Sequence, residues 1–432
     1  MVTTLMIIVF VLGYAAIAFE HPLKVDKAAS ALIIGGLGWG LLAFSGIDHH
    51  TLTHEIQHHI VDIAEILFFL LGAMTIVELI DAHQGFAIIT EKIKTTNKVK
   101  LIWILSIITF FFSAVLDNLT TSIVMAALLT KLIKGKDDLW MFAGIIILSA
   151  NAGGAWSPIG DVTTIMLWIG GQVSASNIIL SIIIPSIVCA VVPLIYLTFK
   201  LQGNIERPEK NIINESTQIY VSSFERNLIF YLGVCGLLFV PIFKTITHLP
   251  PYVGMLLSLG LLWLVTEIIH RNKNQKQKSK LSVISVLKKV DTPTIFFFLG
   301  ILLAVASLQS AGQLDIVAKY LDQTFNGQTP EGIYVINIII GLLSSIVDNV
   351  PLVAGAMGMY TDLTGLYARD GLFWEFLAYC AGTGGSVLII GSAAGVAVMG
   401  ILKIDFIWYL KKISFLALMG YLAGAATYIL MQ

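Results

Sequence analysis

The stretch "AVLDNLTTSIV", residues 114–124, decides how this chain is interpreted. It lies in an apolar run about as long as a membrane span, yet Asp117 and Asn118 stand in its middle. An ionised carboxylate at the centre of a membrane helix costs roughly 2.5–3.5 kcal/mol on insertion scales. The stretch "SSIVDNVPLVA", residues 344–354, repeats the pair as Asp348 and Asn349 in an equally apolar setting. Two matched acids in such surroundings indicate a mechanism.

The composition predicts an all-α polytopic membrane protein. Of 432 residues, 57% are hydrophobic and only 12% are charged, whereas a soluble domain has about 25% charged residues. Apolar runs near 20 residues recur along the whole chain. The three cysteines lie in apolar stretches without CxxC spacing, so we expect no disulfide or metal framework. No Lys or Arg precedes the first apolar run, which favours a retained first span over a signal peptide.

Most apolar runs predict simple spans, and four are interrupted. Clear spans are expected near 3–19, 28–46, 61–81, 177–199, 227–247, 253–270, 291–309 and 404–430. Two longer runs, about 141–169 and 372–399, are rich in glycine and small polar residues. Two more, about 101–133 and 333–360, are broken by the Asp-Asn pairs.

The two halves of the chain resemble each other at a fixed offset. Adding 231 to the first Asp-Asn pair gives the second, and the same shift carries "NAGG" (151–154) onto "GTGG" (382–385). Short polar motifs that recur at one spacing in an apolar background indicate an internal repeat. We therefore expect a first repeat over 1–205, a linker over 206–226 that contains the polar "ERPEKNIINESTQ" (206–218), and a second repeat over 227–432.

The charges predict that the second repeat is inverted relative to the first. If each stretch broken by an Asp-Asn pair is a re-entrant helical hairpin, each repeat has five spans and a broken helix. That odd number turns the second repeat upside down and puts 23 of the 26 Lys and Arg on one side. The positive-inside rule makes this side cytoplasmic and places both termini outside. Counting each stretch as two full spans preserves the same sides, so the charges alone do not prove the hairpins.

Two physical arguments favour hairpins and broken helices. The pieces on either side of Asp117 are short for full crossings, and free backbone groups at mid-depth are tolerated only around a polar cavity. The segment "NAGGAWSPIGDVTT" (151–164) carries three glycines and a proline, which predicts unwinding. The segment "GTGGSVLIIGSAAG" (382–395) does the same in the other half. The alternative is that these glycines merely allow close helix packing.

The polar residues at these breaks form a predicted cation site. They are hard oxygen ligands, and no Lys or Arg lies in the motifs, so a small hard cation suits them better than an anion. A carboxylate in this setting can hold either a cation or a proton, and that competition is the minimal design of an exchanger. The candidates are Asp117, Asn118, Thr120, Thr121, Asn151, Ser157, Asp161, Thr163 and Thr164 in the first half, and Asp348, Asn349, Thr383, Ser386 and Ser392 in the second.

Three further features are less specific. Glu65 lies in the third predicted span and is a candidate for a proton path, with Glu78 weaker. The cluster "DHHTLTHEIQHHI" (48–60) spaces His50, His54 and His58 at i, i+4. This spacing is compatible with metal ligands on one helical face, with a pH-responsive interfacial helix, or with an exposed loop. Asp161 alone could also be a helix cap after a glycine.

The long motifs resemble the signature segments of the NhaD-type sodium/proton antiporters of the ion transporter superfamily. The resemblance rests on "LDNLTTSIVM", "NAGGAWSPIGDVTTIMLWIGGQ", "VDNVPLVAGAMGMY" and "GTGGSVLIIGSAAGVAVMG" and covers most of the chain. It implies scaffold and transport parts, a homodimer, and exchange of Na⁺ or Li⁺ for H⁺. The implied Na⁺ ligands are Asp117, Asn118, Asn151, Asp161, Asp348 and Asn349, with hydroxyls at Thr163, Thr164, Thr383 and Ser386.

We therefore expect an antiporter that works by alternating access in a bacterial inner membrane. Its partners would be Na⁺, Li⁺, H⁺ and the lipid bilayer, with no nucleic acid and no cofactor beyond the transported ions. One alternative is a dicarboxylate or arsenite carrier of the same superfamily, although such carriers have Ser-Asn-Thr where this chain has Asp-Asn. Another is an intramembrane protease, but Asp117 and Asp348 have partners in the repeat and stand in no GxGD or HExxH context, so no enzyme activity is expected.

Overall fold

The computed structural model describes residues 2–18, 20–90, 93–208, 221–274, 278 and 281–432. These residues are helical apart from connecting segments and one isolated bridge between Asn97 and Asn204. Eight described helices are long and apolar enough to cross a membrane, or nine if α20 (Ala393–Leu402) and α21 (Phe406–Lys412) together make one bent span. The predicted all-α polytopic class is confirmed. Most of the polar linker 206–218 lies outside the described residues.

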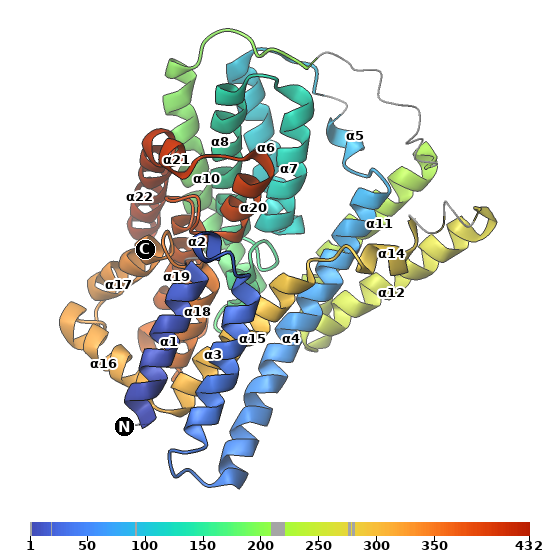
Figure 1. The fold of residues 1–432 in the computed structure, drawn as a ribbon. Coiled ribbons are helices and arrows are strands. Elements are labelled where there is room, and N and C mark those ends of the chain that lie inside the picture. The colour runs from blue at the N-terminus through green and yellow to red at the C-terminus, as the bar shows by residue number, and fades with distance from the viewer. Residues whose placement is uncertain (1, 19, 91–92, 209–220, 275–277, 279–280) are drawn as a thin grey trace.

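The helices pack in two groups, each drawn from both halves of the sequence (Figure 1). In the first group, α3 packs against α1 and α15, and α4 packs against α12 and α15. Its members are α1 (Val2–Ala18), α3 (Lys27–Leu42), α4 (His49–Ala82), α11 (Ser223–Thr247), α12 (Pro251–Ile269) and α15 (Thr292–Ser310), with the short α2 (Glu20–Leu23), α5 (Ala87–Thr90) and α14 (Val283–Leu287) at their ends.

The second group contains every helix that borders a predicted break. In it α8 packs against α6, α7 and α19, α17 packs against α19, and α10 packs against α22. Contacts of α15 with α18 and of α4 with α9 join it to the first group. Its members are α6 (Lys98–Leu116), α7 (Asn118–Leu132), α8 (Lys136–Ala155), α9 (Val162–Ile169), α10 (Ala175–Lys200), α17 (Pro330–Leu343), α18 (Asn349–Met359), α19 (Leu372–Gly384), α20, α21 and α22 (Ser414–Met431), with the amphipathic α16 (Gln313–Phe325) beside α17.

The helices begin and end near the predicted places, with four differences. The helix α6 has 19 residues, so the argument from short pieces fails for it. Gly153 and Gly154 are still helical, and unwinding begins only at Trp156. The run 404–430 is divided at Ile413. The histidine-rich segment is the start of the 34-residue α4, so its interpretation as a loop is wrong.

Residues 231 positions apart make the same close contacts. Ser113 donates a hydrogen bond to the carbonyl of Ala150, and Ser344 donates one to the carbonyl of Ala381. The glycines behave alike. A Cβ atom at Gly153 would lie 2.1 Å from the carbonyl oxygen of Phe110, and one at Gly384 would lie 2.0 Å from that of Gly341. Glycine is therefore required at both positions because two backbones touch there, which is the packing role considered above.

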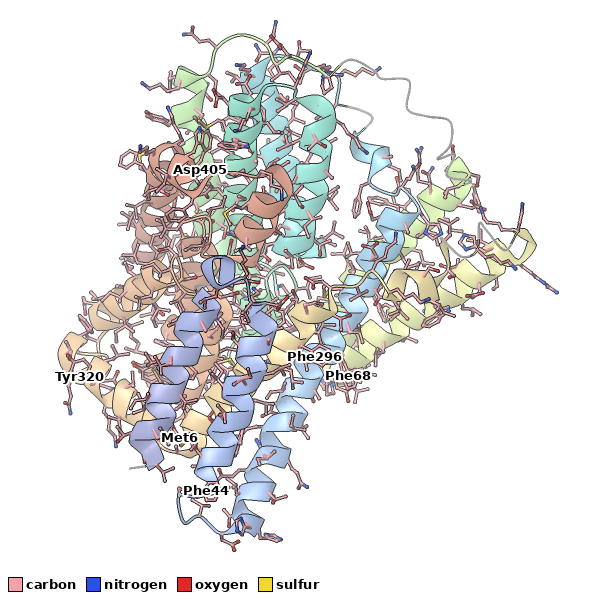
Figure 2. The ribbon with its side chains drawn as sticks, in the orientation of Figure 1. Met6, Phe44, Phe68, Phe296, Tyr320 and Asp405 are labelled. Carbon is pink, nitrogen blue, oxygen red and sulfur yellow. The ribbon has the colours of Figure 1, made fainter. Side chains whose placement is uncertain are left out.

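Large apolar side chains cover the outside of the helices (Figure 2). Phe44 is 81% exposed and Phe68 is 51% exposed, although both belong to long apolar segments. Exposure of such an apolar surface to water would be unfavourable, whereas lipid chains solvate it at no cost. The surface agrees with a membrane location for both helix groups.

Candidate functional site

Four helices begin at one small cavity in the middle of the molecule. Asp117, Asp161, Asp348 and Ser392 are the N-cap residues of α7, α9, α18 and α20. Three of these caps are carboxylates that line the same cavity of about 30 Å³, together with Asn118, Thr120 and Asn349. The fold thus brings the acids and amides of both Asp-Asn pairs together, as the repeat predicts. The cavity holds three acids and the positive ends of several helix dipoles.

Asp161 is the centre of the hydrogen-bond network. Its side chain accepts hydrogen bonds from the amide of Asn118 at 2.5 Å and from the amide of Asn349 at 3.3 and 3.4 Å. The backbone N–H and the hydroxyl of Thr163 also donate to it, at 2.9 and 2.8 Å. Asp161 is only 1% exposed. Amide dipoles from both halves therefore converge on one buried carboxylate, which a simple helix cap does not require.

Asn151 connects the two broken segments. Its amide nitrogen donates to the hydroxyls of Ser386 and Ser392, each at 2.9 Å. Its carbonyl oxygen accepts from the amide of Asn118 at 3.1 Å. The predicted residues Asn151, Ser386 and Ser392 thus belong to the same buried network as Asp161.

Asp117 is held by its own helix. Its carboxylate accepts from the backbone N–H of Thr120 at 2.7 Å and from the Thr120 hydroxyl at 2.9 Å. Its backbone has φ 74° and ψ 159°, a region that is essentially reserved for glycine. Asp348, at the equivalent position, has an ordinary φ of −48°. The two matched acids therefore differ in backbone geometry.

Asp348 is paired with Lys27, a lysine that the sequence alone does not place near the site. The ammonium of Lys27 lies 3.2 Å from Asp348 Oδ2, and both side chains are largely buried. The same ammonium lies 4.3 Å from the centre of the Phe297 ring. No Lys or Arg lies in the motifs themselves, but Lys27 reaches the site from α3 across 321 positions of sequence. A lysine at the first position of an apolar helix was the available signal.

The remaining predicted residues lie beside the network or away from it. Thr164, Ser157 and Thr383 each donate to a nearby backbone carbonyl, which satisfies their hydroxyls locally. The Thr121 hydroxyl is buried, and no partner for it is present among the described residues. Glu65 lies in a different and larger cavity and does not reach the three acids.

Comparison with known proteins decides the family. The model of the citrate transporter family, CitMHS, matches residues 5–374. The sodium/proton antiporter 1 of Arabidopsis thaliana is 44% identical over 98% of this chain and 72% of its own length. The Na⁺/H⁺ antiporter NhaD of Alkalimonas amylolytica is 28% identical over 98% of this chain and 89% of its own. The chain belongs to the NhaD-type sodium/proton antiporter family. The resemblance seen in the motifs is confirmed, and the family is one of transporters and not of enzymes.

Two larger cavities flank the site of this antiporter family protein, one at each end of α15. One, of about 190 Å³, lies by Lys27 and Asp291. It shares Leu119, Thr294 and Ala393 with the site cavity, so the two cavities lie side by side. The other, of about 340 Å³, is lined by the start of α4 and the end of α15.

The larger cavity is separated from the site by one helical turn on each of four helices. On α4, Ile66 lines the larger cavity and Leu70, one turn away, lines the site cavity. On α9 the corresponding residues are Met166 and Val162. On α15, Leu302 lines the larger cavity and Phe298 lines the site cavity, and on α18 the corresponding residues are Ala354 and Val350. All these side chains are apolar, so a thin apolar layer closes this end of the site.

Proposed function

We propose that this protein exchanges Na⁺ or Li⁺ for H⁺ across a membrane by alternating access. One observation carries the proposal: each carboxylate in the cavity is satisfied by a donor that occupies the place of a cation. Asp161 accepts from two amides, Asp348 is paired with the Lys27 ammonium, and Asp117 accepts from Thr120. Related proteins named as sodium/proton antiporters support the choice of Na⁺ and H⁺.

The exchange step follows from the chemistry of these groups. A Na⁺ ion prefers carboxylate and carbonyl oxygens, which Asp161 and the amide oxygens of Asn118, Asn151 and Asn349 supply once the amide groups rotate. A proton on Asp161 removes the charge that such an ion needs. Na⁺ and H⁺ therefore compete for the same carboxylates, and only one of them is carried in each direction.

The cavities support the proposed alternation. The site cavity shares lining residues with the cavity beside Lys27 and is separated from the cavity at the other end by one apolar turn. This asymmetry supports a state that is accessible from one side. A sliding or tilting of the second helix group against the first would exchange the open and closed ends.

The remaining parts of the proposal concern placement in the membrane. The lysine-rich side is cytoplasmic, the two repeats have inverted topology with re-entrant hairpins ending at Asp117 and Asp348, and both termini lie outside. The charge distribution supports this arrangement. We place the protein in a bacterial inner membrane as a homodimer, which mass photometry of the purified protein tests directly.

The anion-carrier alternative is not favoured by the site. Three carboxylates line the cavity, and Lys27, the lysine that reaches it among the residues that the structure describes, is already paired with Asp348. A dicarboxylate would have to approach this excess of negative charge in a medium of low dielectric constant, which is strongly unfavourable.

The test is proton movement in proteoliposomes with an imposed pH gradient. Added Na⁺ or Li⁺ should dissipate the gradient with the native protein. Asp117→Asn and Asp348→Asn should reduce this signal to that of empty liposomes, because the amide keeps the cap but loses the charge. Since Asn is as good an N-cap as Asp, we expect the stability of Asp117→Asn to stay within about 1 kcal/mol. Asp348→Asn also leaves the largely buried Lys27 ammonium without its carboxylate, so this variant should lose more stability.

Asp405→Asn is the matched control. Asp405 (Figure 2) is also an N-cap, of α21, but it is exposed and does not line the cavity. This variant should exchange ions like the native protein. Native rates in both Asp117→Asn and Asp348→Asn would overturn the proposed mechanism.

A further inference from the structure

A second cluster of ligand atoms lies on α4, at the cavity of about 340 Å³. His58, His59 and Asp62 each offer one ligand atom, and these atoms all lie within 4.8 Å of one another. His58 Nδ1 lies 3.6 Å from Asp62 Oδ2. All three residues line the same cavity. They take no part in the network around Asp161.

The donor set is that of a transition-metal site and not of a sodium site. Two imidazoles and a carboxylate suit Zn²⁺, Ni²⁺ or Cu²⁺, whereas Na⁺ prefers oxygen ligands alone. Four-coordinate zinc holds its ligand atoms roughly 3.4 Å apart, given metal–ligand distances near 2.1 Å. The spacing of His58 and Asp62 is already close to this value because residues at i and i+4 share a helical face.

The surroundings of the cluster also fit a metal site. His59 Nε2 lies 3.4 Å from the hydroxyl of Ser310, and the His59 ring lies 6.0 Å from that of Trp39. A ligating histidine commonly has its second nitrogen hydrogen-bonded in this way, which fixes the ring. The side chains of His58 and Asp62 are 72% and 65% exposed, so an ion reaches them from solvent. Glu65 lines the same cavity and offers a further carboxylate.

We propose that His58, His59 and Asp62 bind a divalent transition metal at the mouth of this cavity, and that the bound metal slows ion exchange. The second half rests on the proposed function. The cavity is one apolar turn from the three acids. A double positive charge at its mouth repels Na⁺ on the way to the site.

Zinc binding to the purified, tag-free protein in nanodiscs tests the first half, by isothermal titration calorimetry with ZnCl₂. We expect about one Zn²⁺ per chain. His58→Gln, His59→Gln and Asp62→Asn should each weaken binding by about tenfold or more. His54→Gln removes an exposed histidine one turn earlier on the same helix and should bind zinc like the native protein. Absence of binding at millimolar zinc, or native affinity in His58→Gln/Asp62→Asn, would overturn the site.

The second half is tested in proteoliposomes. Zinc should slow Na⁺-driven proton movement by the native protein, and His58→Gln should need at least about tenfold more zinc for the same slowing. Equal slowing in both proteins, or no slowing of the native protein under conditions where calorimetry shows binding, would refute a role in transport. Because calorimetry needs no transport, failure of the proposed exchange activity would leave the test of the metal site intact.

Discussion

Asp117 combines a strained backbone with a charge at the cavity. A residue with a side chain in this region of φ and ψ costs of the order of 1–3 kcal/mol. Glycine would avoid this cost but would lose the carboxylate and both hydrogen bonds with Thr120. Strain of this kind persists where the surrounding structure over-determines it, and here it presents an acid at the point where α6 ends and α7 begins.

Lys27 is the residue whose effect on ion affinity is most directly predictable. Its ammonium occupies Asp348, so an incoming Na⁺ must displace it. Lys27→Met removes this competitor and should lower the apparent KM for Na⁺, by about tenfold if the competition is worth 1.4 kcal/mol. The measurement is the dependence of proton movement on Na⁺ concentration in proteoliposomes.

Lys27→Arg is the matched control for this prediction, because it keeps the positive charge and the cation–π contact with Phe297. Its KM should stay closer to the native value than that of Lys27→Met. An unchanged KM in Lys27→Met would mean that the ion pair plays no part in Na⁺ binding.

At the level of elements, the ends of α4 and α12 are joined by two stacked histidines. The rings of His83 and His270 lie 5.1 Å apart at 6° to each other, and their Nε2 atoms are 3.2 Å apart. His83 Nδ1 donates to the carbonyl of Leu79 at 2.7 Å, so His83 Nε2 accepts the proton of His270 Nε2. The contact therefore requires the His83 ring to be neutral, because a protonated Nε2 has no lone pair with which to accept the hydrogen bond.

Acid should weaken this contact. Burial lowers the pKa of His83. Burial and the neighbouring His83 ring together lower the pKa of His270 to about 4. An ordinary histidine has a pKa of 6.5, so between pH 6.5 and pH 4 these histidines bind protons in the unfolded chain but not in the folded protein. Stability is therefore fully present above pH 6.5 and falls as the pH drops through this window. The nearby Glu225 and Lys273 form their own ion pair at 2.9 Å.

The check is the thermal unfolding midpoint of the detergent-solubilised protein as a function of pH. The midpoint should fall more steeply from pH 6.5 to pH 4 in the native protein than in His83→Gln/His270→Gln. His50→Gln, which removes an exposed histidine elsewhere on α4, should follow the native curve. Parallel curves for the native and double-variant proteins would show that the pair does not carry the acid sensitivity.

At the scale of the molecule, the sequence predicts what depends on local pattern and misses what depends on how distant helices pack. The interruptions at Asp117 and Asp348 were predictable because a polar pair stands out in an apolar run. The repeat also predicts that both pairs belong to one site, whereas the convergence of their amides on Asp161 appears only in the structure. The pairing of Lys27 with Asp348 was not predictable, because periodicity says nothing about which helix start faces which break.

The inverted arrangement is itself testable through the loops that follow the two breaks. Lys134 follows α7 and Thr361 follows α18, and both are exposed. If both stretches turn back at their acids, five spans, formed by α8, α10, α11, α12 and α15, separate the two loops. This odd number of crossings puts the loops on opposite faces of the membrane. The lysine distribution then puts Lys134 in the cytoplasm and Thr361 outside.

Single cysteines report these positions once the exposed Cys235 is replaced by Ser, since Cys189 and Cys380 are buried. In intact cells an impermeant maleimide should label Thr361→Cys, whereas Lys134→Cys should react only after the membrane is permeabilised. Each variant must first retain Na⁺-driven proton movement, so that the labelling reports the working fold. Labelling of both cysteines from the same side would refute the inverted topology, because two repeats that point the same way cannot place equivalent loops on opposite faces.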